Sequence, residues 1–266
     1  MPTWKETPKK LIKPSPYTGR GKLYVNHNMK LNYAFFLFLC FLTLSSSAGS
    51  ISSTNSTPAR ESWSSKELDL ANTAKHIDYL SKEEKNIIFY MNLMRMDGTK
   101  FFNTYFQDFV RDHNKRMQQY SNYKDLKINT YDSYYRGLKE DLKKVKNFEL
   151  YYPDETLTFL ALSHGKDMNR RNLADHKSSD GRTMPDRLSK YFPNHAMAEN
   201  LAFGFAKGLD NVCMLLLDKG VPDLGHRKNM LNTSYGLNTV GVSIQPHPTY
   251  TYSATIDFVG IPKTKN

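Results

Sequence analysis

Residues 222–231 of this chain read Pro-Asp-Leu-Gly-His-Arg-Lys-Asn-Met-Leu, and residues 198–202 read Ala-Glu-Asn-Leu-Ala. A further histidine, His176, lies a similar distance upstream, within Asp-His-Lys-Ser-Ser-Asp-Gly. In this order the three segments supply the imidazoles of His176 and His226 and the carboxylate of Glu199, which a fold could bring into one cleft. Two neutral imidazoles with carboxylates suit a divalent cation, zinc before other metals.

The order and spacing of these segments resemble the signature of the CAP superfamily, which includes cysteine-rich secretory proteins, insect venom antigens, plant pathogenesis-related proteins and many bacterial relatives. The resemblance is to an SCP-like extracellular domain of the bacterial type and covers roughly residues 77–260. Gly241-Val242 and Asp257-Phe258 belong to it as well. It implies an α+β fold, an α-β-α sandwich of the CAP type.

CAP proteins resembling this one have a cleft lined by two histidines and two acidic residues. His176, Glu199 and His226 occupy three of these positions. In better-known relatives the second acid is a glutamate that follows a tryptophan by three residues. Here residues 215–218 read Leu-Leu-Leu-Asp, so the matching acid is Asp218, which is shorter by one methylene, about 1.5 Å.

The resemblance therefore implies a metal site made of His176, Glu199, Asp218 and His226. It implies a divalent cation, zinc first, and no organic cofactor. The alternative is that hydrogen bonds between the histidines and the acids fix the cleft without any metal.

Three further polar residues near these motifs have simpler interpretations. His164 falls on an apolar helix face, and we expect a buried, hydrogen-bonded histidine. Arg227 is expected to donate hydrogen bonds to backbone carbonyls, with anion binding as the alternative. Ser178, like Ser179 beside it, lies close to His176 in sequence, which leaves a Ser–His hydrolase as an alternative, but no nucleophile elbow or known triad order supports it.

The N-terminal region has the pattern of an export signal. Lys30 precedes an apolar run of about 11 residues at 34–44, and Ser-Ser-Ser-Ala-Gly follows at 45–49. We expect a signal peptide at 29–48 and no transmembrane segment after its cleavage, because a membrane span needs roughly 20 apolar residues. An uncleaved anchor is the alternative. Residues 1–28 are interpreted as a basic leader from a mis-assigned start, since Met29 begins the signal well.

Charge and cysteine content limit the possible partners. Residues 1–48 contribute +6 of the net charge of +11, so we expect no nucleic-acid partner for the rest. Of the two cysteines, Cys40 lies in the expected signal peptide. Cys213 then has no partner for a disulfide, unlike the cysteines of many animal CAP proteins, and is expected to be a buried, unreactive thiol.

After the signal we expect a flexible tether at 49–76 and the CAP domain at 77–262. A capping box at Ser81 predicts a helix, and alternating apolar residues predict strands at 240–244 and 250–258. A further strand is expected at 198–203, and a turn is expected around Pro246-His247-Pro248. Helices that precede paired strands favour the α+β class. The stretch near residues 114–150 is rich in Tyr and Lys and is expected to be a helical insertion.

These observations favour an exported binding or interaction module rather than an enzyme, acting on an unidentified extracellular ligand or protein. One alternative is a hydrolase, a peptidase or esterase that uses a metal or a serine in the same cleft. Another is binding of a lipid or sterol, which would require an apolar groove.

Overall fold

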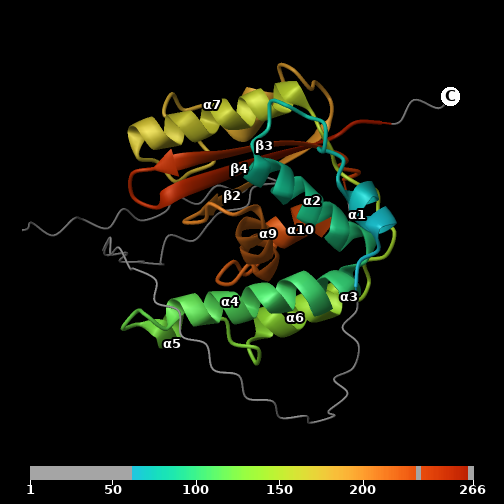
Figure 1. Ribbon diagram of the computed structural model, residues 1–266. Coiled ribbons are helices and arrows are strands. Elements are labelled where there is room, and N and C mark those ends of the chain that lie inside the picture. The colour runs from blue at the N-terminus through green and yellow to red at the C-terminus, as the bar shows by residue number, and fades with distance from the viewer. Residues whose placement is uncertain (1–61, 232–234, 263–266) are drawn as a thin grey trace, which may run out of the picture.

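The computed structural model describes residues 62–231 and 235–262, which form a four-stranded sheet between layers of helices (Figure 1). Helix α7 (Glu155–Arg171) lies against one face of the sheet. The other face carries α2 (Lys82–Met96), α9 (Gly208–Leu217) and α10 (Gly225–Leu231). The predicted α-β-α sandwich is confirmed. The expected leader at 1–28 and signal peptide at 29–48 lie outside the described residues.

The sheet consists of β1 (Tyr152–Pro153), β2 (Ala196–Phe203), β3 (Thr239–His247) and β4 (Thr251–Gly260). Their order is β1-β3-β4-β2, so β2 is an edge strand. Strand β4 pairs antiparallel with both β2 and β3, and the short β1 runs parallel to β3. All three predicted strands are present.

The turn between β3 and β4 includes Pro248 but lies slightly further along the chain than the predicted Pro246-His247-Pro248 segment. Pro246 is part of β3 and faces Tyr252, so the turn falls at residues 248–250. Strand β1 pairs only with Thr239 and Val240 of β3. The far end of β3 is therefore a sheet edge, where a residue without a backbone N–H is tolerated.

Helix α7 packs directly on the backbone of β3. The side chain of Asp154 caps its N-terminus by accepting a hydrogen bond from the Leu157 N–H at 2.8 Å. A β-carbon placed on Gly241 of β3 would lie 2.2 Å from the Leu157 carbonyl carbon and 2.4 Å from the Thr158 nitrogen. Real atoms cannot approach so closely, so the layer spacing at this point depends on a residue without a side chain.

Gly241→Ala should therefore destabilise the domain by at least about 3 kcal/mol, because a methyl group there meets rigid backbone. Gly137→Ala is the matched control. Its β-carbon would meet only the Arg227 side chain, at 3.5 Å, and the change from glycine to alanine favours a helix. Urea unfolding of both variants checks this, and equal stabilities would contradict the close packing of α7 on β3.

On the opposite face, α2 begins at the predicted capping box. The Ser81 hydroxyl accepts a hydrogen bond from the Glu84 N–H, and the Glu84 carboxylate accepts one from the Ser81 N–H. Glu84 also accepts a hydrogen bond from the Ile244 N–H at 2.8 Å, which ties α2 to β3. Cys213 of α9 is fully buried beneath this layer, and burial raises the pKa of its thiol well above the usual range. Its expected burial is confirmed.

A helical subdomain follows α2 and forms the lowest layer in Figure 1. It comprises α3 (Gly98–Phe101), the π-helix η1 (Phe102–Phe106), α4 (Gln107–Met117), α5 (Tyr123–Leu126) and α6 (Ser133–Leu142). The helical structure predicted near 114–150 is thus confirmed up to Leu142, and its interpretation as an insertion stays a prediction. Three lysines at the end of this region pair with acids, as Lys143–Glu140, Lys144–Asp141 and Lys146–Asp97. These three lysines are therefore not an unpaired basic surface.

The expected tether at 49–76 is wrong for its last part. Residues 65–71 form helix α1 (Ser65–Ala71), which begins at a capping box between Ser64 and Glu67 and packs on α2. The Trp63 indole N–H donates to the Thr104 hydroxyl at 3.0 Å, and the Asn92 amide donates to the Ala71 carbonyl. The serines that suggested a linker include a helix cap, so the folded domain begins before residue 77.

Candidate functional site

The first histidine–acid pair lies on the side of the sheet that carries α7. Glu199 projects from β2, and His176 lies in the loop between α7 and the short helix α8 (Met184–Leu188). The His176 Nδ1 is 2.7 Å from the Glu199 Oε1. Arg187 of α8 donates to the other carboxylate oxygen of Glu199 and, at 2.7 Å, to the His176 carbonyl. One buried carboxylate thus holds both the histidine ring and α8.

Two carboxylates meet across the β2–β4 pair at this point, because Glu199 is paired in register with Asp257. Burial alone would raise the pKa of Glu199, but the hydrogen bond with His176 and the charge of Arg187 lower it to about 2. Burial and the neighbouring negative charge of Glu199 raise the pKa of Asp257 well above its usual range. Glu199 is therefore the ionised member of the pair and Asp257 the protonated one. The sequence motif included Asp257 but gave no sign of this role.

The second pair joins His226 of α10 to Asp218, the residue that ends α9. The His226 Nδ1 is 2.7 Å from the Asp218 Oδ1, and the Asp218 Oδ2 accepts a hydrogen bond from the Arg227 N–H at 3.2 Å. Asp218 has a left-handed backbone with φ 54°, which turns its side chain towards α10. The shorter acid therefore does reach the histidine.

Strand β2 separates the two pairs. Successive side chains of a strand face opposite sides of a sheet, so Glu199 faces α8 while Asn200 faces α10. The Asn200 amide donates to the His226 carbonyl at 3.1 Å, and its oxygen accepts a hydrogen bond from Asn229 at 2.8 Å. Because β2 is an edge strand, no other strand of the sheet covers its outer side.

Each histidine leaves one ring nitrogen without a partner. The Nε2 atoms of His176 and His226 are buried, and neither has a hydrogen-bond partner among the described residues. A carboxylate on Nδ1 fixes the proton there and leaves the Nε2 lone pair available, as in many metal-binding histidines. Across residues 62–231 and 235–262, no group of three or more His, Cys, Asp and Glu side chains is placed to hold one metal ion. A site shared by His176, Glu199, Asp218 and His226 therefore stays a prediction.

Comparison with known protein families agrees with the resemblance found in the sequence. The model of the CAP family, described as the cysteine-rich secretory protein family, matches residues 91–259, more than half of the chain. The chain belongs to the CAP family. No curated protein matches the sequence.

Two solved structures are similar to parts of this chain. One is an extracellular protein containing an SCP domain from Bacillus anthracis str. Ames, with 28% identity, a TM-score of 0.35 and coverage of 43% of this chain and 35% of that one. This chain thus spans about a third of the Bacillus protein's length. The other is an outer surface protein from Borrelia burgdorferi, with 20% identity, a TM-score of 0.37 and coverage of 51% and 97%.

The remaining sequence interpretations can be checked within the CAP domain. His164 is buried on α7 and hydrogen-bonded through both ring nitrogens, as expected. Arg227 donates to the carbonyls of Leu216, Leu217 and Tyr134, which confirms its interpretation as a backbone-binding arginine. None of the helices in the described residues has the length and apolar character that crossing a membrane requires.

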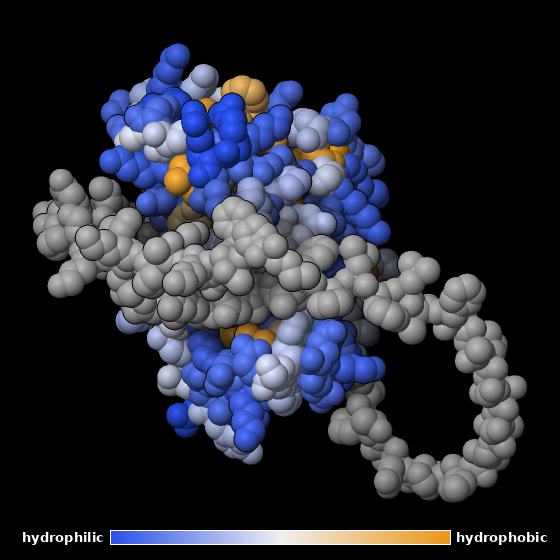
Figure 2. Space-filling view, turned by 90° about the vertical axis from the view of Figure 1, so that its left-hand side faces the viewer, coloured by the Kyte–Doolittle hydropathy of each residue, from blue (hydrophilic) through white to orange (hydrophobic). Residues whose placement is uncertain are grey.

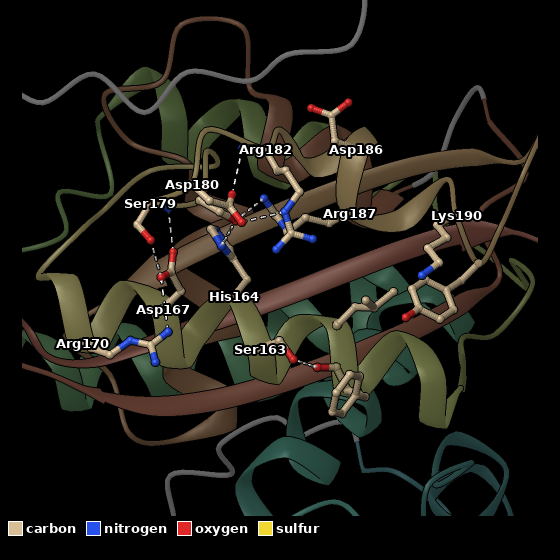
Figure 3. Close-up of a pocket in the computed structure, with 14 residues that line it drawn as sticks. Ser163, His164, Asp167, Arg170, Ser179, Asp180, Arg182, Asp186, Arg187 and Lys190 are labelled. Carbon is tan, nitrogen blue, oxygen red and sulfur yellow. Dashed lines mark hydrogen bonds and ion pairs between the residues drawn. The ribbon is translucent and has the colours of Figure 1, made fainter.

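A pocket of about 430 Å³ lies between α7, α8 and the loop that joins them (Figure 3). His164, Ser178 and Arg187 line it together with the apolar side chains of Phe159 and Leu160. Ser178 lies near His176 in sequence, but its hydroxyl contacts His164 instead, at 3.2 Å. The two residues are 14 positions apart in the chain, and no local motif relates residues at that separation.

Proposed function

We propose that this CAP domain is an exported binding module in which His176 and His226 bind a divalent cation, zinc first, through their Nε2 atoms. The observation that carries the proposal is the pair of buried Nε2 atoms without hydrogen-bond partners in the described chain. A buried polar group left without a partner costs about 1–3 kcal/mol, which a bound cation would recover.

The donor set fits a cation bound by two imidazoles whose other ligands come from water or from a recognised partner. The carboxylates of Glu199 and Asp218 bind the Nδ1 atoms, so they orient the rings rather than supply metal ligands. Zinc enzymes hold their metal with three protein ligands and leave one position open. Two histidines alone favour a module whose ligand completes the shell over a metal-dependent hydrolase.

Surface character favours a polar ligand over a lipid on the face turned to the viewer in Figure 2. Where that face is not drawn in grey, it is mainly hydrophilic, with small separate apolar areas. Export is supported by the basic, apolar and small-residue pattern of residues 29–48. The binding-module proposal is therefore preferred to the lipid-binding alternative.

Calorimetric titration of the domain with zinc tests the metal site. The wild type should bind one ion, and His176→Ala and His226→Ala should each abolish most of the binding. Asp218→Asn should weaken it about 10–100-fold, because the ring then loses its orienting carboxylate. Affinity should also fall as the pH is lowered, since protons compete for the imidazole nitrogens.

His76→Ala is the matched control, because His76 is exposed and lies in neither pair. It should bind zinc as the wild type does. If the wild type binds neither zinc nor another divalent ion, the proposal fails. Only the interpretation of both pairs as hydrogen bonds that fix the cleft would then stand.

A further inference from the structure

The pocket between α7 and α8 contains a serine, a histidine and an arginine, none of which is a proposed metal ligand. Ser178 lies in the loop between the two helices, His164 on α7 and Arg187 on α8. Figure 3 shows His164 and Arg187 pointing towards each other across the pocket floor. The Ser178 hydroxyl lies between them, 3.2 Å from the His164 Nδ1 and 3.3 Å from the Arg187 Nη1.

We propose that Ser178 is a nucleophile and His164 its general base, and that the pocket accepts a small carboxylic ester. A nucleophile in contact with a base, a group that orients the base and a donor for the developing oxyanion are the parts such a site requires. Each has a counterpart among the residues around this pocket.

The orientation of the base follows from its second contact. The His164 Nε2 is 3.0 Å from the Asp175 carbonyl oxygen, which can only accept a hydrogen bond. Nε2 must therefore carry the proton, and Nδ1 must present its lone pair to the Ser178 hydroxyl. Burial also lowers the pKa of His164, so the neutral ring needed by a general base is favoured.

Arg187 provides the oxyanion donor. Its side chain is only 5% exposed, and its Nε has no hydrogen-bond partner among the described residues. A buried guanidinium N–H without a partner is costly, and the negative oxygen formed by attack on an ester would satisfy it. Arg187 also binds Glu199 through Nη2, so its position is fixed before any ligand enters.

The pocket suits a short acyl chain. Its volume of about 430 Å³ lies within the usual range of small-molecule sites. Phe159 and Tyr191, which line it, are 59% and 47% exposed, and Leu160 lies beside them. Exposed rings next to a polar floor offer an apolar wall for the acyl group and leave the ester carbonyl near Ser178.

The chemistry balances without a metal or redox partner. The Ser178 Oγ forms a bond to the ester carbonyl carbon while its proton passes to the His164 Nδ1. The bond from that carbon to the alkoxy oxygen then breaks, and the departing alcohol takes the proton from His164. Water attacks the acyl-serine in the same way, which releases a carboxylic acid and restores the Ser178 hydroxyl.

Labelling with a fluorophosphonate, a reagent that reacts covalently with nucleophilic serines, tests the proposal on the folded protein. The wild type should be labelled, and mass spectrometry of its peptides should place the label on Ser178. Ser178→Ala should lose the label, and His164→Gln should slow labelling at least about 100-fold. Ser179→Ala is the matched control, because the Ser179 hydroxyl donates to Asp167, at 2.7 Å, and does not contact His164 in this way. This variant should be labelled on Ser178 as the wild type is.

Hydrolysis of p-nitrophenyl acetate and butyrate, measured with EDTA present, gives a second readout that does not depend on the metal site. Activity should be lost in Ser178→Ala and retained in Ser179→Ala. An unlabelled wild type, or a label on another serine, would overturn the proposal even if a variant failed to fold. A label on Ser178 without ester turnover would overturn its hydrolytic part.

Discussion

Glu199→Gln is expected to destabilise the CAP domain by about 3–5 kcal/mol at pH 7. The substitution keeps the shape of the side chain but removes the counter-charge of Arg187, whose side chain is 5% exposed, while that of Glu199 is 1% exposed. Breaking one member of a buried ion pair leaves the other charge uncompensated, which is much more costly than losing an exposed pair. The His176 ring loses its charged acceptor as well.

Glu140→Gln is the matched control, because Glu140 pairs with Lys143 on the surface of α6, where both side chains are more than half exposed. Such pairs contribute little, so a change below about 1 kcal/mol is expected. Urea unfolding of both variants and the wild type gives the comparison. Similar losses in the two variants would contradict the interpretation of Glu199 as the buried anchor of α8.

The pH dependence follows from the pKa of Glu199, which falls from 4.5 to about 2 on folding. A carboxyl group whose pKa is lowered in the folded state stabilises the fold above its unfolded pKa and loses that effect as the pH falls through its folded pKa. The difference in stability between the wild type and Glu199→Gln should therefore be largest at pH 5 and above. It should shrink as the pH falls from about 4.5 towards 2.

Asp257 should reduce the destabilisation that Glu199→Gln causes. The charge of Glu199 helps to keep Asp257 protonated, and the charge of Arg187 favours its ionised form. Once Glu199 is neutral, Asp257 can ionise and serve as the counter-ion of Arg187. Adding Asp257→Asn to Glu199→Gln should therefore destabilise the domain by more than the two single changes together.

The fold could be predicted from the sequence wherever local pattern and tertiary structure agree. The capping box at Ser81 starts α2, and the alternating Val240, Val242 and Ile244 lie in β3. The sequence patterns gave wrong predictions where one residue type occurs in two kinds of structure. The serines before α1 look like a linker, yet Ser64 is a helix cap, and Pro246 looks like a turn residue, yet lies at a free strand edge.

The histidine–acid pairs could be predicted only because a family resemblance supplied their partners. No spacing rule connects His176 to Glu199 across 23 residues, and only the fold brings them within 2.7 Å. Arg187 and Asp257, which set the charge state of Glu199, were missed for a related reason. Their importance arises from burial beside a carboxylate, and burial of a charged residue leaves no periodic signal in the sequence.

The contact between His164 and Ser178 in the pocket beside α7 could not be predicted from the sequence either. His164 was correctly interpreted as a buried, hydrogen-bonded histidine from its place on an apolar helix face. Its partner, Ser178, lies in a loop without regular structure, where sequence gives no information on direction. A residue can thus be correctly placed in the core while the chemistry available to it depends on a loop that pattern cannot position.

Arg227→Ala is expected to destabilise the domain by about 3–5 kcal/mol and to loosen the helical subdomain. The guanidinium group donates to the carbonyls of Leu216 at 2.7 Å, Leu217 at 2.9 Å and Tyr134 at 3.0 Å. Leu216 and Leu217 are the last residues of α9, so their carbonyls have no partner within that helix. Each buried carbonyl left without a donor costs about 1–3 kcal/mol, and the missing side chain adds a cavity.

Lys228→Ala is the matched control, since Lys228 is the exposed neighbour of Arg227 on α10 and should change stability by less than about 0.5 kcal/mol. Arg227→Lys should recover little of the stability lost in Arg227→Ala, because one ammonium group cannot reproduce the planar guanidinium group that binds α6 and α9 together.

Hydrogen exchange shows which part of the domain is destabilised. Amides of α6 should exchange faster in Arg227→Ala, because Tyr134 of that helix loses its link to α10, while amides of β2 should be unchanged. The Arg227 N–H bonded to Asp218 belongs to the backbone and survives the substitution, so the His226–Asp218 pair and zinc binding should persist. Loss of zinc binding together with unchanged exchange in α6 would show that Arg227 supports the cleft rather than the junction of the helices.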